Sequence, residues 1–358
     1  MTGPLIEGYS YWDRLGKERP VVLYGTGNGA DKIIDILEQK GIRADGIFAS
    51  DGFVRDRFFR GIKVSSYSDI IDKIGDNISV LLSFGTNRPE VLEFISELDK
   101  KHDLIIPEVP LYGGDVFDYE YFQNNQNKIL ATAKLFEDET SRSLFFDAVN
   151  FRLTGKMRYL TLCDPFDKSV KDLFGDSRIG VIVDGGAYRG DTANVFLNVF
   201  PGSEVLYAVE PDPHSFRKLT ESSNDSRIRT VNAALSSFCG FTSFSSSSSR
   251  GAGVSGNSKR SKSISVPAVT IDAILNGEKC DLIKLDVEGN EREALLGAAN
   301  TFNRFTPGLI ISLYHRTDDL FDIPRSIKTV NEDYGLYLRR PFCVPMWDLN
   351  LFAVNRRR

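Results

Sequence analysis

Residues 181–192, VIVDGGAYRGDT, place an apolar strand directly before a glycine-rich turn and the start of a helix. Asp184 ends the strand, where its carboxylate can accept hydrogen bonds from a ligand ammonium or its bound water. Gly186 and Gly190 remove side chains where the backbone and a ligand approach closely. A nicotinamide dinucleotide site instead has the order G-x-G-x-x-G, with helix amides facing a pyrophosphate. The acidic residue before the glycines favours a ligand with a cationic head and no phosphate. The alternative is a tight turn without a ligand.

The next predicted strand, residues 205–210, ends in Glu210. A carboxylate at this point can hold both hydroxyls of an adenosyl ribose, in methyltransferases and dehydrogenases alike. Combined with Asp184 it favours the methyl donor S-adenosylmethionine. Asn232 and Ala233, at the end of the third strand, are predicted to line the adenine. The candidate cofactor-binding residues are Asp184, Gly185, Gly186, Ala187, Gly190, Thr192, Glu210, Pro211, Asn232, Ala233 and Asp286.

Strand and helix patterns alternate through both halves of the chain, which predicts an α/β fold with parallel sheets. We expect a Rossmann-like N-terminal domain at 1–112, a helical connector at 113–172 that packs between two sheet domains, and a larger Rossmann-like domain at 173–358. The strands of the domain at 173–358 are predicted at residues 181–184, 205–210, 228–235, 282–286 and 309–313. Residues 241–257 are rich in serine and glycine, and they are predicted to form a loop or mobile flap.

Length and composition limit the class of protein. The chain has 358 residues, enough for two domains, and a formal net charge of −5, which gives no overall attraction to nucleic acid. The N-terminus lacks a secretory signal pattern, and no apolar run approaches the roughly 20 residues that cross a bilayer. The four scattered cysteines and three histidines argue against a zinc site. We therefore expect a cytoplasmic protein, with homodimerisation possible for a chain of this organisation.

The second half resembles the FkbM family of S-adenosylmethionine-dependent methyltransferases. The matching stretches, in order, are VIVDGGAYRGDT, YAVEPDP, VNAALSSFCGFTSF, VTIDAIL, IKLDVEGNEREALLGA and LIISLYHRTDDLFDIP. The resemblance covers about residues 159–353. It implies a class I methyltransferase sheet and O-methylation of a sugar hydroxyl in a glycan, a polysaccharide under biosynthesis or a nucleotide-sugar.

The N-terminal region is similar to small Rossmann-like domains that bind nucleotide-sugars in some sugar acetyltransferases. Its turn GTGNGA, residues 25–30, can present helix amides to a phosphate. The candidate residues are Gly25, Gly27, Asn28 and Asp51. The alternative is a domain used only for packing, dimerisation or partner docking.

Candidate catalytic residues follow the fourth and fifth strands, where open α/β sheets bind their ligands. They are Asp286, His315, Glu288 and Lys284. A sugar hydroxyl must lose its proton during attack on the methyl group, and we expect His315 or Asp286 to be the general base. Structural alternatives are an ion pair between Lys284 and Asp286, and a role for Glu288 at the start of the following helix.

A second version of the mechanism uses a magnesium ion that acidifies the hydroxyl. Asp286, Glu288 and Asp319 would supply the hard oxygen ligands that magnesium prefers.

Other functions remain open at this stage. An NAD-dependent sugar oxidoreductase would use the N-terminal domain, but no Tyr-x-x-x-Lys pair follows GTGNGA. A non-catalytic scaffold could retain the cofactor fold. A nucleic-acid methyltransferase is disfavoured because the chain lacks an NPPY-type tetrad after the fourth strand and a basic composition.

Overall fold

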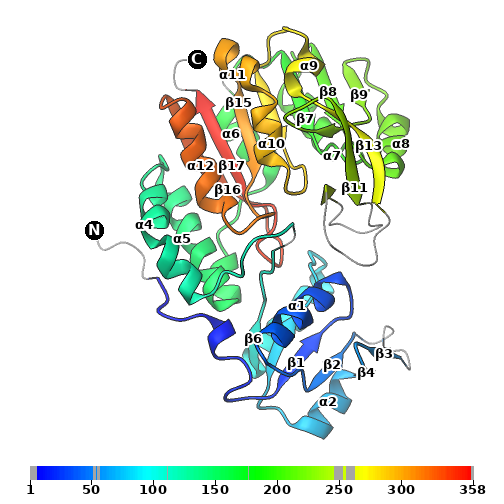
Figure 1. The fold of residues 1–358 in the computed structure, drawn as a ribbon, viewed down its shortest axis with the longest axis vertical. Coiled ribbons are helices and arrows are strands. Elements are labelled where there is room, and N and C mark those ends of the chain that lie inside the picture. The colour runs from blue at the N-terminus through cyan, green and yellow to red at the C-terminus, as the bar shows by residue number, and fades with distance from the viewer. Residues whose placement is uncertain are drawn as a thin grey trace.

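The computed structural model describes residues 6–50, 54, 57–110, 112–175, 177–245, 253–254 and 263–355. A six-stranded sheet in the order β3-β4-β2-β1-β5-β6 forms the N-terminal part, drawn in blue and cyan in Figure 1. All its pairings are parallel except that of β3 with β4. Its elements are β1 (Val21–Tyr24), α1 (Asn28–Gln39), β2 (Gly46–Phe48), β3 (Phe58–Phe59), β4 (Ile62–Ser65), α2 (Tyr67–Ile74), β5 (Ser79–Leu82), α3 (Pro89–Lys101) and β6 (Asp103–Ile105). A short 3-10 helix, η1 (Tyr11–Asp13), precedes them.

A seven-stranded sheet forms the C-terminal part, in the order β16-β17-β15-β14-β7-β8-β9. Strand β17 runs antiparallel to both of its neighbours, and the other pairings are parallel. The elements are β7 (Val181–Gly185), α7 (Asp191–Val199), β8 (Val205–Val209), α8 (Pro213–Ser222), β9 (Ile228–Val231), α9 (Ile271–Leu275), β14 (Leu282–Leu285), α10 (Glu291–Leu296), α11 (Ala299–Phe305), β15 (Gly308–Ser312), α12 (Asp319–Val330), β16 (Tyr334–Arg339) and β17 (Asn350–Asn355). The chain order reverses between β7 and β14, which is where open sheets of this kind bind ligands.

The α/β fold class predicted from the sequence is confirmed. One strand differs from its prediction, because residues 228–235 do not form a single strand. Strand β9 ends at Val231, and Ala234–Leu235 form β10 in a separate sheet. Residues 232–233 between them leave the large sheet, so Asn232 stands at its carboxyl edge.

The helical connector covers an edge of the second sheet. Helices α4 (Tyr119–Ala133) and α5 (Glu139–Thr154) begin at the N-cap aspartates Asp118 and Asp138, and α5 ends at Gly155, which has φ 62°. The Ser141 hydroxyl accepts the N–H of Leu338 in β16 at 2.9 Å. The expected packing between two sheet domains is therefore only part of the arrangement, because α5 also lies along β16 (Figure 1). Further along, η2 (Met157–Leu160) and α6 (Phe166–Phe174) lead into β7.

A small four-stranded sheet corrects the prediction of a loop at 241–257. Strands β11 (Gly240–Ser245) and β13 (Ser263–Val269) pair antiparallel, flanked by β12 (Gly253–Val254) and β10. Phe244 and Val266 are buried between them. Strand β11 was not predicted because its serine-rich composition is typical of a loop. The strand is stabilised by hydrogen bonds to β13, which lies outside the segment. Residues 246–252 and 255–257 lie outside the described part of the chain.

The two sheets share one interior. Thr86, after β5, forms an antiparallel bridge with Val344, and a Cβ added to Gly85 would stand 2.3 Å from the Trp347 ring. The end of β5 in the N-terminal sheet therefore packs against the loop between β16 and β17. No helix among the described residues is both long and apolar enough to cross a membrane.

Candidate active site at the carboxyl edge of the second sheet

The glycine turn after β7 packs tightly between the ends of its neighbouring strands, β14 and β8. Gly186 has φ +73°, and a Cβ added there would lie 1.9 Å from the carbonyl oxygen of Asp286. The Gly186 and Ala187 N–H groups both donate to the carbonyl of Val209 in β8, at 2.9 and 3.0 Å. Only glycine fits this contact, so the turn joins the ends of β14 and β8 to the start of α7.

Asp184 lies beneath the glycine turn, and its contact with a ligand ammonium stays a prediction. The side chain is fully buried, with Oδ2 accepting the Thr192 hydroxyl at 2.5 Å and Oδ1 lying 3.2 Å from the Lys284 ammonium. The same ammonium donates to the carbonyls of Gly185 and Gly186, at 3.2 and 3.0 Å. Oδ2 is hydrogen-bonded and Oδ1 faces the Lys284 ammonium, so Asp184 helps to position the glycine turn through Thr192 and Lys284.

Lys284 lies away from the other candidate catalytic residues and pairs with Asp184, not with Asp286 as the structural alternative supposed. Burial lowers the pKa of its ammonium, but the charges of Asp184 and Asp286 outweigh that effect and leave the pKa raised. A permanently charged lysine beneath the turn is a positioning group.

Glu210 stands at the end of β8, at the place predicted for a ribose-binding carboxylate. Its two oxygens accept the N–H groups of Tyr188 and Asp212, at 2.9 and 2.8 Å. The Asn232 amide donates to the backbone carbonyls of Glu210 and Pro211, at 2.8 and 3.4 Å, so Asn232 braces this strand end. Burial raises the pKa of Glu210 to about 7. Each carboxylate oxygen retains a lone pair for a ribose hydroxyl.

Two of the small residues predicted around the cofactor are part of the core. Ala187 is 1% exposed and Ala233 is 4% exposed. Gly190, with φ 93°, is the N-cap of α7. The methyl groups of the two alanines therefore pack inward, and contact with a cofactor is left to the backbone at these positions.

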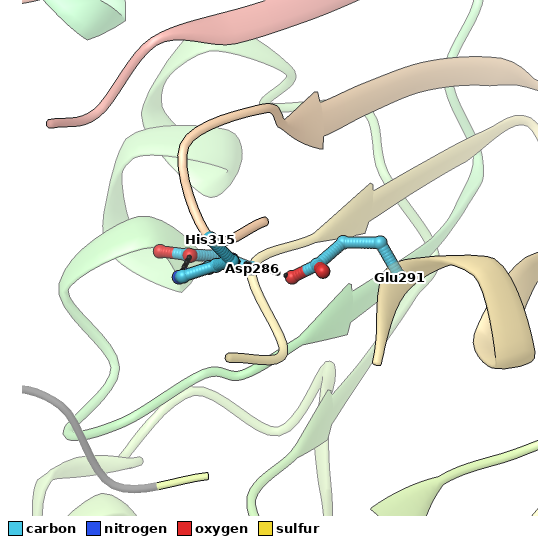
Figure 2. A group of neighbouring side chains, drawn as sticks. All are labelled: Asp286, Glu291 and His315. Atoms are coloured by element: carbon cyan, nitrogen blue, oxygen red, sulfur yellow. Dashed lines mark hydrogen bonds and ion pairs between the residues drawn. The ribbon is translucent and has the colours of Figure 1, made fainter. Parts of the chain in front are cut away.

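His315 lies at the centre of a cluster of three carboxylates. Figure 2 shows the His315 ring and Asp286 close together, with Glu291 reaching toward them from α10. Glu291 Oε1 lies 2.8 Å from His315 Nδ1. On the other side of the ring, Nε2 lies 3.3 Å from Glu288 Oε2 and 3.5 Å from Asp286 Oδ1. The ring is fully buried.

The charge state of this cluster argues against His315 as the general base. Burial lowers the pKa of the imidazole, but Glu291 and Glu288 outweigh it and raise the pKa well above its usual value. The raised pKa favours the protonated ring, and an imidazolium has no free lone pair with which to accept a proton. Asp286 differs, because its side chain is 31% exposed and the charges of Lys284 and His315 overcome burial to lower its pKa.

The predicted magnesium ligands are not brought together. Asp319 is fully buried and accepts hydrogen bonds from Arg292 Nε at 3.0 Å and from the Arg316 N–H at 3.1 Å. Its carboxylate is occupied by these donors, whereas Asp286 and Glu288 face His315. Another set, Asp286, Glu291 and His315, has ligand atoms within 4.8 Å of one another. The imidazolium compensates only one of the two carboxylate charges in this set, but an imidazole nitrogen is not one of the hard oxygen ligands that magnesium prefers.

Three residues of the cluster were not identified from the sequence. The Tyr112 hydroxyl donates to Glu288 Oε2 at 2.6 Å, and its ring meets His315 edge-on at 5.6 Å. The Tyr314 hydroxyl donates to Asp286 Oδ1 at 3.0 Å. Glu291 could have been found from its spacing in VEGNE, because its carboxylate accepts the N–H of Val287 in the turn before α10. Tyr112 could not have been identified from the sequence, because it precedes its partner Glu288 by 176 residues.

Glu288 does not serve the following helix as its structural alternative supposed. It has φ 56°, and its carboxylate is directed to Tyr112 and His315. The first-turn residue Glu291 satisfies the backbone N–H groups there instead. Glu288 therefore belongs to the cluster.

The candidate nucleotide residues of the N-terminal sheet form the turn between β1 and α1. Gly25 has φ +109°, and an added Cβ would stand 2.6 Å from the Ser83 hydroxyl, so the turn packs tightly on the end of β5. Gly27 is the N-cap of α1 and Asn28 its first residue. Asp51 lies outside the described residues. Binding of a nucleotide here stays a prediction.

The fold and the site define the class of protein as an S-adenosylmethionine-dependent methyltransferase with a Rossmann-like sheet. Residues 184–335 match the model of the methyltransferase FkbM domain. The crystal structure of methyltransferase FkbM from Methylobacillus flagellatus KT is similar over 95% of this chain and 91% of that chain, with 19% identity and a TM-score of 0.69. The shared fold thus includes the N-terminal sheet and the connector.

Two further structures match about half of the chain. An rRNA methylase from Streptococcus thermophilus covers 52% of this chain and 92% of its own, with 11% identity and a TM-score of 0.33. A putative methyltransferase from Streptococcus mutans in complex with SAH covers 53% and 98%, with 10% identity and a TM-score of 0.33. No curated protein has a significantly similar sequence. The matches support neither an NAD-dependent oxidoreductase nor a non-catalytic scaffold.

The affinity for S-adenosylmethionine should depend on pH through Glu210. With a pKa of about 7, its carboxylate becomes protonated below neutral pH and can no longer accept hydrogen bonds from two hydroxyls and two backbone N–H groups together. We expect the Kd measured by calorimetry to rise about tenfold per pH unit between pH 7 and 5. Glu210→Gln should bind weakly and without this slope. A flat wild-type profile would show that the carboxylate does not contact the cofactor.

Proposed function

We propose that the enzyme transfers a methyl group to a hydroxyl oxygen of a sugar, in a glycan, a polysaccharide or a nucleotide-sugar. The observation that carries the proposal is the ionised and partly exposed carboxylate of Asp286 beside the glycine turn. The Asp286 N–H donates to the Gly185 carbonyl at 3.1 Å, and its own carbonyl touches Gly186. A proton acceptor thus stands directly against the residues that would hold the methyl donor.

The chain's residues fit S-adenosylmethionine by their chemistry. A free lone pair on each Glu210 oxygen supports binding of the two ribose hydroxyls, and the turn at Gly186 has no side chain that would separate the backbone from a ligand. The bound cofactor supplies an electrophilic methyl group on a sulfonium. Transfer of that methyl group to a sugar hydroxyl would give S-adenosylhomocysteine as the second product, and Asp286 would accept the hydroxyl proton.

The residues around Asp286 keep it ready for this role. The Tyr314 hydroxyl donates to Asp286 Oδ1 at 3.0 Å, and His315 Nε2 faces the same oxygen at an ion-pair distance of 3.5 Å. Together with the charge of Lys284 and the Ser312 hydroxyl, they lower the pKa of the carboxylate. Orientation of the oxygen behind the methyl carbon supplies the remaining rate enhancement, because the sulfonium needs no further activation.

The test is methyl transfer by the full chain. The protein is incubated with S-adenosylmethionine and a panel of methyl glycosides and UDP-sugars, and S-adenosylhomocysteine release is followed with the product mass. We expect a product heavier by one methyl group, with an O-methyl signal in its NMR spectrum. Methylation only of amines or carboxylates in a parallel panel would overturn the proposal. So would binding of the cofactor, measured by thermal shift, without methylation of any sugar.

A further inference from the structure

A cavity of about 330 Å³ lies beside the carboxylate cluster, between the connector and the catalytic domain. Gly114, Asp115 and Tyr121 line it from the connector side, and Gly289, Arg316 and Thr317 line it from the catalytic side. We propose that this cavity binds one sugar ring of the acceptor, and that Tyr121 of the connector is a specificity-determining residue. The proposal rests on the proposed function and adds the location and composition of the acceptor site.

The cavity is next to the groups that would perform the reaction. Gly289 directly follows Glu288 in the chain, and Arg316 directly follows His315. Tyr112, which directly precedes the cavity-lining residue Gly113, is hydrogen-bonded to Glu288. A ring held in the cavity would therefore lie against Gly289 and Arg316, the immediate neighbours in sequence of Glu288 and His315.

The walls of the cavity are joined before any ligand binds. The Thr317 hydroxyl donates to the backbone carbonyl of Asp115 at 2.6 Å, and Arg316 Nε donates to the carbonyl of Gly289 at 2.8 Å. Gly114 has φ +113°, and an added Cβ would stand 3.2 Å from the Thr317 hydroxyl oxygen. The connector thus closes onto the catalytic domain through a glycine that no larger residue replaces without strain.

The lining matches the chemistry of a sugar ring. The Tyr121 hydroxyl, the Asp115 carboxylate and the terminal guanidinium nitrogens of Arg316 have no hydrogen-bond partner within the described part of the chain. Tyr121 is half-buried and also offers an aromatic face. Burial and the charge of Asp318 raise the pKa of its hydroxyl to about 12, so it remains a donor. An aromatic face with a donor, a cation and a carboxylate recognises the apolar face and the vicinal hydroxyls of one pyranose.

The volume of the cavity suits a single sugar ring. Pockets for small ligands typically measure about 300–1,000 Å³, and this one is at the lower end of that range. It therefore takes one ring, such as a chain-terminal residue or the sugar of a nucleotide-sugar. Because Tyr121 lies outside the FkbM domain at 184–335, acceptor choice would be determined partly by the connector.

The test compares Tyr121→Phe and Tyr121→Ala with the wild type and with Tyr119→Phe, a matched control on the same helix outside the cavity lining. Methyl glycosides of glucose, galactose, mannose and rhamnose are the probes. Their binding to the S-adenosylhomocysteine complex of the full chain is measured by saturation-transfer NMR, together with KM and kcat for any glycoside that is methylated.

We expect Tyr121→Phe to weaken glycoside binding about tenfold, the effect of one lost hydrogen bond in a site built for it. Tyr121→Ala should weaken it further, with the cofactor Kd and the control variant unchanged. Equal glycoside binding in wild type and both Tyr121 variants overturns the cavity proposal, even if methylation of sugars is observed. Failure of every probe to bind wild type overturns it as well. The proposed function is judged separately, by product mass.

Discussion

Asp286→Asn should lower kcat by about 10²- to 10⁴-fold, the contribution typical of a general base. Asparagine keeps the size of the side chain and the backbone contacts with Gly185 and Gly186, but it cannot accept the hydroxyl proton. The Kd for S-adenosylmethionine should therefore remain at the wild-type value. Initial rates at saturating cofactor and calorimetric titration measure the two quantities separately.

The pH profile of wild-type kcat tests the same assignment. The pKa of Asp286 is lowered, so the carboxylate is ionised throughout the range above its ordinary value of 3.8. We expect kcat at saturating cofactor to be level from pH 5 to 7. A base at His315 would instead give a rate that falls across this whole range as the pH drops, because the pKa of the ring is raised well above 6.5. Exposed Asp191→Asn on α7 is the matched control, and near-normal turnover in Asp286→Asn would remove Asp286 from the mechanism.

The parts of the site predicted well from the sequence are those encoded by neighbouring residues. The strand, turn and helix at 181–192 are contiguous, and their order alone placed Gly186 and Glu210 at the carboxyl edge of a parallel sheet. The direction of Asp184 was not predictable in this way. It depends on Lys284, 100 positions away in the chain, whose length and charge reach beneath the turn.

The charge state of His315 is a second property that the sequence does not contain. Its position after the fifth strand predicted proximity to Asp286, and the two side chains are indeed neighbours. Whether the ring accepts or holds a proton depends on how many carboxylates share its buried surroundings. Glu291 and Glu288 decide it, and their distances to the ring follow from the turn at Gly289 and from the packing of Tyr112.

His315→Ala should reduce the free energy of unfolding by about 3–5 kcal/mol, the cost of leaving a buried charge without its partner. Glu291 is 1% exposed, and its contact with the imidazolium at 2.8 Å compensates that burial in the wild type. Urea unfolding measures the loss. Exposed His214→Ala on α8 is the control and should leave the stability unchanged. Adding Glu291→Gln to His315→Ala should recover part of the loss, because the uncompensated charge is then gone.

The stabilisation that His315 contributes should depend on pH. The pKa of His315 is raised in the folded state above its value of 6.5 in the unfolded chain. Protonation of the ring therefore contributes its full stabilisation below pH 6.5, and the contribution is lost as the pH rises through the folded-state pKa. Wild-type stability should fall on the alkaline side, and His315→Gln should lack that decrease. If wild type and His315→Gln lose stability in parallel above pH 6.5, His315 is not the cation that holds the three carboxylates together.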